Sequence, residues 1–233
     1  MAIKAERGVV YMIWGNDARH ERALERSIES LKAVHPELPT EVVRLGHEFA
    51  AKGLANKAGL FRNSPFRETL FLDLDTVVLR RLDYGFERAR RFGLACVINE
   101  CPWANRHTGL SAAGDLIEYN TGVLFFTERA RPVFEAWERL VDTVDGSLTH
   151  MRPGDMVVQF PFSDQAAFAA AIEECRFNPF CLPMNWNFRP EFYFSFFGPV
   201  VIWHDYRDIP PEIQKITDYY NAPGALIRFF GAR

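Results

Sequence analysis

The sequence has few cysteines, no excess of basic residues and no long apolar run. Its four cysteines form no C-x-x-C pair, so neither a zinc knuckle nor a disulfide framework is indicated. A formal net charge of -3 provides no basic surface for nucleic acid and no polybasic membrane signal. No apolar stretch approaches the roughly 20 residues of a membrane span, and the start, MAIKAERGVVYMIWGN, lacks the apolar core of a signal peptide. We therefore expect a cytoplasmic protein with reduced cysteines, in which any polyanionic ligand is bound at a local site.

Apolar and aromatic residues, in contrast, are abundant, at 48% and 14% of the 233 residues. This amount is enough for one full hydrophobic core, whereas two domains would each be small. The sequence contains no internal repeat and no low-complexity tract. We predict a single domain over residues 1–233.

Strand-like and helix-like segments alternate along the chain. An apolar run at residues 8–15, an amphipathic helix at about 19–34 and a strand at 41–45 are typical of the opening of a parallel α/β sheet. Further strands are predicted at 67–79, 93–99, 119–127 and in the apolar run that ends at His204. Further helices are predicted at 52–63, 80–91, 131–144, 162–174 and 209–220. The pattern predicts an α/β fold with a mostly parallel sheet flanked by helices.

Three segments lack a regular period. Residues 100–118 read as a long loop, which in a compact domain is usually functional or disordered. Trp103 and His107 in this loop are weak candidates for a substrate platform. Residues 149–162 contain prolines and read as irregular, and residues 178–198 are crowded with aromatic residues. If the protein has a substrate, we expect its specificity to reside in 100–118 and 185–197.

Two aspartates interrupt the apolar strand predicted at 67–79. Asp73 and Asp75 lie between the apolar runs TLFL and TVVL, and residues two apart on an extended chain share a face. Burying two like charges together is costly unless a cation neutralises them, and a divalent metal held by oxygen ligands would do so. Two alternatives remain open at this stage: the pair caps a turn in solvent, or an arginine such as Arg80 or Arg81 pairs with one aspartate.

Other polar residues lie at predicted strand ends. They are Asn16 with Asp17, Asn120 and His204. Ligands of open α/β sheets bind at the carboxyl ends of strands. A lone histidine after a strand is more often a satisfied half-buried residue, but beside two aspartates His204 becomes a candidate third ligand for an ion such as Mn²⁺. Asp164, taken alone, reads as the N-cap of the helix at 162–174, a role that Ser163 could also fill.

Several motifs together resemble those of the GT-A fold glycosyltransferases. They are VVYMIWGND, KAGLFRNSPFRETLFLDLDTVVL, YNTGVLFF, FSDQAAF and VIWHDY, and they span nearly the whole chain. The chain is most similar to family 8, the group that contains glycogenin and bacterial lipopolysaccharide galactosyltransferases. The resemblance implies a single-domain GT-A fold, a nucleotide-sugar donor, expected to be a UDP-hexose, and a glycan, lipid-linked or small-molecule acceptor.

The resemblance also implies roles for individual residues. Asp73, Asp75 and His204 would bind Mn²⁺ (or Mg²⁺), which bridges the donor diphosphate. Lys57 would contact the nucleotide, although a solvated helix lysine is an equally weighted alternative. The remaining implied donor-site residues are Asn16 and Asp17 at the nucleoside base, Leu74 between the two aspartates, and Asn120 at the donor sugar. Asp164 and Gln165 would lie beside the sugar and the acceptor hydroxyl.

One motif departs from the family pattern. Family 8 members usually carry a glycine soon after the C-terminal histidine and a lysine beyond it, which grip the diphosphate. Here the residues are HDYRD, so Arg207 is an imperfect replacement. The change from D-A-D or D-S-D to D-L-D is minor.

The implied reaction is transfer of a hexose to a hydroxyl with retention of configuration. With retention, the departing phosphate deprotonates the acceptor while Gln165 or Asp164 stabilises positive charge on the sugar; with inversion, Asp164 would be the base. A first alternative is a haloacid-dehalogenase-like phosphohydrolase with Asp73 as nucleophile and Asp75 as acid/base, although that motif normally lies on the first strand. A second is a non-catalytic sugar-nucleotide-binding module.

Overall fold

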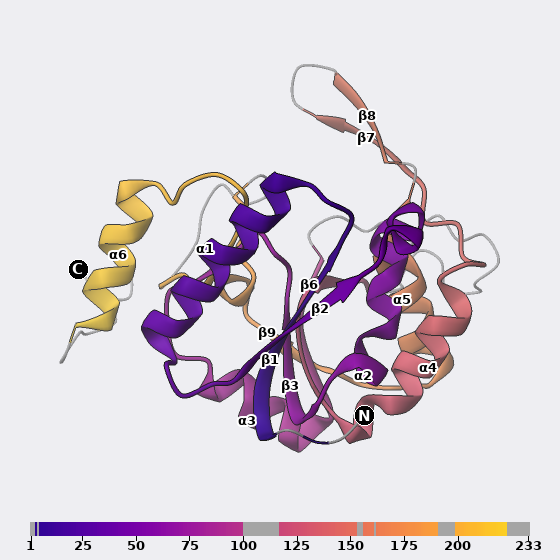
Figure 1. Cartoon of the computed structure of the whole chain (residues 1–233), viewed down its shortest axis with the longest axis horizontal. Coiled ribbons are helices and arrows are strands. Elements are labelled where there is room, and N and C mark those ends of the chain that lie inside the picture. Colours follow the sequence, from indigo (N-terminus) through magenta and orange to yellow (C-terminus); the bar gives the residue numbers. More distant parts are fainter. Residues whose placement is uncertain are drawn as a thin grey trace, which may run out of the picture.

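The protein is built around a six-stranded mixed sheet with helices on both faces (Figure 1). The computed structural model describes residues 3, 5–99, 117–152, 156–160, 162–190 and 199–222. In spatial order the strands are β2 (Thr40–Leu45), β1 (Ala5–Trp14), β3 (Phe66–Leu72), β6 (Tyr119–Thr127), β5 (Leu94–Ile98) and β9 (Phe180–Leu182). β1 is parallel to β2 and β3, and β5 is parallel to β9, whereas β6 is antiparallel to both neighbours. The predicted mixed, mostly parallel α/β sheet is confirmed.

Helices cover the two faces of the sheet in separate groups. α1 (Ala18–Val34) and α3 (Asp83–Phe92) pack on one face through side chains such as Leu24, Leu31 and Phe86. The other face is covered by α2 (Leu60–Asn63), α4 (Arg131–Leu140) and α5 (Asp164–Glu174), which contribute Leu60, Trp137 and others to a second core cluster. Because both faces are covered, β6 is buried along nearly its whole length and β1 is buried from Gly8 to Ile13.

Shorter elements complete the described chain. A 3₁₀ segment, η1 (His47–Gly59), precedes α2 and is kinked at Gly53, where φ is 49°. The 3₁₀ turn η3 (Glu128–Ala130) precedes α4, and the 3₁₀ turn η4 (Met184–Trp186) follows β9. α6 (Pro211–Asn221) follows the small antiparallel pair of β4 (Thr76–Val78) and β10 (Ile202–His204). Among the described residues, no helix is both long and apolar enough to cross a membrane.

The single strand predicted at 67–79 is wrong. β3 ends at Leu72, the chain turns at residues 73–75, and β4 leaves the central sheet to pair with β10. The turn is closed by the Thr76 backbone N–H and hydroxyl, which donate to the Asp73 carbonyl oxygen at 3.3 and 2.8 Å. Asp73 and Asp75 therefore lie in a turn between two strands rather than on one face of a strand.

Other differences concern element boundaries. Residues 149–162, predicted to be irregular, contain the hairpin of β7 (Leu148–Arg152) and β8 (Met156–Phe160), which stands off the body (Figure 1). The helix predicted at 131–144 ends at Leu140 in a turn, the helix predicted at 80–91 begins only at Asp83, and β9 and η4 were not predicted. Trp103 and His107, and most of the loop at 100–118, lie outside the described residues, as do residues 191–197.

Candidate active site

The turn at residues 73–75 lies at the carboxyl edge of the central sheet and is held from three sides. The Asp73 backbone N–H donates to the Gly122 carbonyl oxygen of β6 at 2.8 Å. The Thr76 hydroxyl also contacts Ser27 Oγ of α1, 2.9 Å away. The Asp205 N–H, just after β10, donates to the Asp75 carbonyl oxygen at 2.9 Å. The backbone that carries both aspartates is therefore positioned by the sheet, by α1 and by β10.

His204 completes a group of three possible metal ligands. β10 pairs with β4 so that His204 lies opposite Thr76, which brings its ring to the turn. The His204 Nε2 atom is 3.3 Å from Asp75 Oδ1 and 3.6 Å from Asp73 Oδ2. One ligand atom from each of the three residues lies within 4.8 Å of the others. The structure thus brings together the three residues expected to bind a metal.

The absence of a side chain at Gly122 leaves room for the side chains of His204 and Asp73. A Cβ atom on Gly122 would clash with the His204 ring and would lie 2.6 Å from Asp73 Oδ2. Two carboxylates and one imidazole form a donor set that suits Mn²⁺ or a similar divalent ion. The residues present therefore fit a divalent metal.

Lys57 lies inside the site. Its side chain is 4% exposed, and Nζ is 2.7 and 2.8 Å from the two carboxylate oxygens of Asp73. Burial by itself lowers the pKa of Lys57, but the negative charges of Asp73, Asp164 and Asp75 raise it above its ordinary value, so the ammonium stays charged. The alternative of a solvated helix lysine is wrong. Arg81, one of the two arginines suggested as a partner of an aspartate, pairs instead with Glu37 and Asp83.

Asp75 is held as a carboxylate. Burial alone would raise its pKa, but the charge and hydrogen bond of His204, with the charge of Lys57, lower the pKa to about 2. The group therefore keeps a charged oxygen ligand at neutral pH.

A cavity of about 350 Å³ opens over these residues. Besides the three ligands it is lined by Trp14, His20, Leu54, Lys57, Leu74 and Tyr206. Asn16 and Asp17 are exposed and are not among its lining residues; Asp17 caps α1 by accepting the Arg19 N–H at 2.8 Å. Their role at a nucleoside base stays a prediction. Trp14, His20 and Tyr206 were not predicted from the sequence, although Trp14 lies in the strand predicted at 8–15 and Tyr206 lies two residues after the strand predicted to end at His204.

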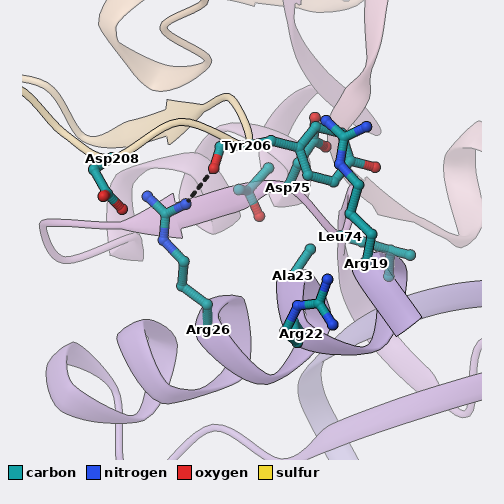
Figure 2. Close-up of a pocket in the computed structure, with 9 residues that line it drawn as sticks. Arg19, Arg22, Ala23, Arg26, Leu74, Asp75, Tyr206 and Asp208 are labelled. Carbon is teal, nitrogen blue, oxygen red and sulfur yellow. Dashed lines mark hydrogen bonds between the residues drawn. The ribbon is translucent and has the colours of Figure 1, made fainter. Parts of the chain in front are cut away.

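A second cavity, of about 250 Å³, shares Leu74, Asp75 and Tyr206 with the first. Figure 2 shows three arginines of α1 along it, Arg19, Arg22 and Arg26. The Arg19 guanidinium lies over the Tyr206 ring at 3.8 Å, and Arg26 donates to the carbonyl oxygens of Tyr206 and Arg207. These arginines give the region beside Asp75 a positive face.

Arg207, the imperfect match to the family lysine, is engaged elsewhere. Its guanidinium donates to both carboxylate oxygens of Asp205, at 2.9 and 2.7 Å. Its own carbonyl oxygen accepts hydrogen bonds from Arg26 and from Trp203 Nε1. The Arg207 side chain is therefore directed to its neighbour Asp205.

Asn120 is buried at the start of β6, and its side-chain oxygen already has partners. It accepts the Gly122 backbone N–H and the Asn187 side-chain N–H, each at 2.8 Å. Asn187 in turn contacts His204. Asn187 was not singled out from the sequence, because its position after an aromatic turn carries no local pattern. The predicted contact of Asn120 with a donor sugar stays a prediction.

Asp164 and Gln165 begin α5 behind the site. Ser163 is the N-cap of this helix, so the reading of Asp164 as the cap is wrong. Asp164 is 2% exposed and accepts the Thr121 hydroxyl at 2.7 Å; burial raises its pKa, and the charge of Lys57 opposes that rise. The Gln165 Oε1 atom is buried without a hydrogen-bond partner among the described residues. Neither residue is among the described lining of the two cavities.

Comparison with solved structures identifies the fold. No protein-family model matches the sequence, and no curated protein matches it by sequence. Mouse xyloside xylosyltransferase 1 aligns with a TM-score of 0.55 and 16% identity over 88% of this chain and 100% of that one. The galactosyltransferase LgtC, solved with donor and acceptor sugar analogs, aligns with a TM-score of 0.55 and 16% identity over 85% of this chain and 86% of LgtC. The chain has the fold of the GT-A glycosyltransferases.

A further match is a variant of LgtC. A structure of LgtC with an active-site glutamine replaced by glutamate aligns with a TM-score of 0.52 and 16% identity, over 94% of this chain and 92% of LgtC. The GT-A fold confirms the predicted fold class. It is not the fold expected for the phosphohydrolase alternative, which loses its support.

Proposed function

We propose that the protein is a metal-dependent glycosyltransferase that transfers a hexose from a nucleotide sugar, expected to be a UDP-sugar, to a hydroxyl acceptor with retention of configuration. The observation that carries the proposal is the group of Asp73, Asp75 and His204 in a cavity at the carboxyl edge of a GT-A sheet. The structural neighbours named above include a xylosyltransferase and a galactosyltransferase, which supports a sugar-transfer reaction.

Asp73, Asp75 and His204 would hold Mn²⁺ or Mg²⁺. When bound, the ion would act as a Lewis acid that neutralises charge on the departing nucleoside diphosphate. Lys57 holds Asp73 in place and keeps a positive charge beside it. The carboxylate of Asp75 stays ionised, so the site is ready for the ion at neutral pH.

Arg19 and Arg22 would grip the diphosphate in place of the family lysine. Arg207 is bonded to Asp205, whereas the α1 arginines line the cavity that shares Asp75 with the site (Figure 2). Guanidinium groups bind phosphate oxygens with two parallel hydrogen bonds. Arg22→Ala should therefore raise KM for the donor more than it lowers kcat. Lys32→Ala, which removes an exposed charge from the same helix, is the matched control.

The burial of Asp164 supports retention. A general base must reach the acceptor hydroxyl, whereas the Asp164 carboxylate is buried and bonded to Thr121. In the retaining reaction the departing phosphate takes the acceptor proton. The Gln165 carbonyl oxygen has an unmet capacity to accept, which suits a group that faces positive charge on the sugar. LgtC also has a glutamine in its active site.

The test is release of UDP from a panel of UDP-sugars with and without Mn²⁺. Wild type should hydrolyse one donor slowly in a metal-dependent way, and Asp75→Ala and His204→Ala should each lower the rate by at least about 10²-fold. Asp142→Asn removes an exposed carboxylate that lines neither of the two cavities at Asp75 and should leave the rate unchanged. A non-catalytic module would bind a nucleotide sugar without releasing UDP, and that result would contradict the proposal.

A further inference from the structure

We propose that Asn187 and Asn120 are positioning residues that set the protonation of His204, so that Nε2 is the ring nitrogen presented to the metal. The proposal rests on the metal site of the proposed function. It assigns a task to Asn187, which was not predicted from the sequence, and a task to Asn120 other than a sugar contact.

The argument starts from a backbone N–H, which can only donate. The Gly122 N–H donates to one side-chain atom of Asn120 at 2.8 Å, so that atom is the carbonyl oxygen. The same oxygen is 2.8 Å from a side-chain atom of Asn187, which must then be the amide nitrogen. The orientations of both amides follow from one main-chain group.

The next step reaches the imidazole. Because the side-chain nitrogen of Asn187 donates to Asn120, its side-chain oxygen faces His204 Nδ1, 2.6 Å away. An amide oxygen only accepts, so Nδ1 must carry a proton. Without a metal, Nε2 donates to Asp75. With a metal ion bound, the proton on Nδ1 leaves the only lone pair of the neutral ring on Nε2, the atom that faces Asp75 and Asp73.

Gly122, Asn120, Asn187 and His204 form a chain of hydrogen bonds, here called the relay. Burial makes the relay selective for one orientation of each amide. Asn187 is 0% exposed and Asn120 is 4% exposed, so bulk water does not compete for these hydrogen bonds. Reversing either amide would place like atoms against each other at hydrogen-bond distance, which is costly in a buried site. Outer-shell partners of this kind orient a histidine ligand and increase its basicity.

The relay also links two ligands through one residue. The Gly122 N–H sets the Asn120–Asn187–His204 chain, and the Gly122 carbonyl oxygen accepts the Asp73 N–H at 2.8 Å. The Asn187 segment is itself fixed on β10, because the His204 N–H donates to the Phe188 carbonyl oxygen at 2.9 Å. The spacing between Asp73 and the His204 ring is therefore determined by the main chain of β6 and β10.

The first test is ¹⁵N nuclear magnetic resonance of the histidine rings in the whole chain, metal-free and then with Zn²⁺, with the His204 signals assigned by their loss in His204→Asn. We expect a proton on His204 Nδ1 in both states. His35 is an internal reference, because its Nε2 accepts the Leu82 N–H and its Nδ1 donates to Glu37. A wild-type spectrum without a proton on His204 Nδ1 overturns the relay, whatever the reaction of the enzyme.

The second test separates the relay from general packing. Asn187→Leu removes the acceptor and should weaken Mn²⁺ binding, measured by calorimetry, about 10–100-fold. Asn187→Asp keeps an acceptor for Nδ1–H and should bind Mn²⁺ more tightly than Asn187→Leu and retain the Nδ1 proton. Equal Mn²⁺ affinity in wild type and Asn187→Leu, or equal losses in both variants, overturns the assignment. Neither test uses sugar transfer, so failure of the proposed reaction is distinguishable from failure of the relay.

Discussion

At the scale of single residues, Lys57 neutralises a site with several carboxylates. It is buried against Asp73 and lies within the fields of Asp75 and Asp164. Removing one partner of a buried ion pair leaves the other charge without compensation. We predict that Lys57→Met lowers the free energy of unfolding by about 2–4 kcal/mol, measured by urea denaturation in EDTA.

The control for this prediction is a lysine in the same segment. Lys52 is 57% exposed and lies 3.9 Å from Asp142, so Lys52→Met should change stability by less than about 0.5 kcal/mol. Equal losses of unfolding free energy in the two variants would mean that the charge of Lys57 is not needed to compensate the charge of Asp73.

Gly122 allows the proposed metal ligands to approach one another. A methyl group there would overlap the His204 ring and press on Asp73. Gly122→Ala should therefore weaken Mn²⁺ binding by at least about 10-fold, as measured by calorimetry. Gly59→Ala is the matched control, because its Cβ would meet only the ends of the Arg62 and Asn63 side chains, at 3.1 and 3.3 Å. Unchanged affinity in Gly122→Ala would mean that the ion binds elsewhere.

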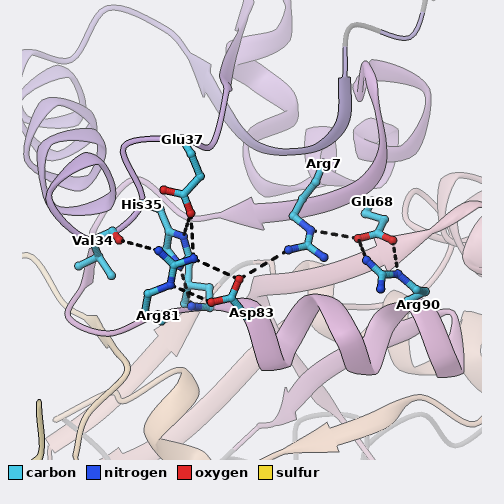
Figure 3. Close-up of polar contacts among 9 residues, drawn as sticks. Arg7, Val34, His35, Glu37, Glu68, Arg81, Asp83 and Arg90 are labelled. Carbon is cyan, nitrogen blue, oxygen red and sulfur yellow. Dashed lines mark hydrogen bonds and ion pairs between the residues drawn. The ribbon is translucent and has the colours of Figure 1, made fainter. Parts of the chain in front are cut away.

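At the scale of elements, Glu68 joins β3 to β1 and α3 (Figure 3). It accepts hydrogen bonds from Arg7 Nε at 3.0 Å and from Arg90 Nε and Nη2 at 2.5 and 3.0 Å. Burial alone would raise the pKa of Glu68, but the hydrogen bonds from Arg90 and Arg7 lower it below 4.5. The carboxylate is therefore more stable in the folded state than in the unfolded state.

This shift predicts a pH dependence of stability. Because the folded-state pKa is lowered, the contribution of Glu68 is fully present above pH 4.5 and is lost as the pH falls through the lower folded-state value. Glu68→Gln should lower the free energy of unfolding by about 1–3 kcal/mol at pH 7. In urea titrations, the difference in this free energy between the variant and wild type should narrow below pH 4.5. Glu6→Gln, at an exposed carboxylate 3.5 Å from Arg67, should show neither effect. A gap that stays constant down to pH 3 would contradict the assignment.

At the scale of the whole molecule, the proposed metal site joins elements that are distant in sequence. Asp73 and Asp75 follow β3, whereas His204 ends β10. An ion bound by all three stabilises the folded state by mass action, about 2.7 kcal/mol at 100 times Kd. We predict that Mn²⁺ at about 100 times its Kd raises the Tm of the protein by about 5–10 °C and that EDTA reverses the rise.

The control is the same scan with His204→Ala and Asp75→Asn. Both variants should lose most of the Mn²⁺-dependent shift because each lacks a ligand. A full shift in either variant would place the ion outside this group.

The sequence alone determined the class of fold and the three residues proposed to bind a metal. Alternation of apolar strands and amphipathic helices is a local property of the chain, so β1, α1, β2 and β6 were predicted within a few residues. Asp73, Asp75 and His204 could be identified because charged or titratable residues beside buried strands need a physical reason.

Only the tertiary structure decided how these residues are arranged. The apolar residues on either side of Asp73–Asp75 look like one strand, because no glycine or proline marks the turn; pairing of β4 with β10 divides them. Lys57 could not be placed from its spacing, because a kinked 3₁₀ segment does not keep the period of an α-helix. The proposed Nδ1–H form of His204 depends on its hydrogen bond to Asn187 and on that of Asn187 to Asn120. The direction of these bonds is defined only when distant groups meet in a buried site.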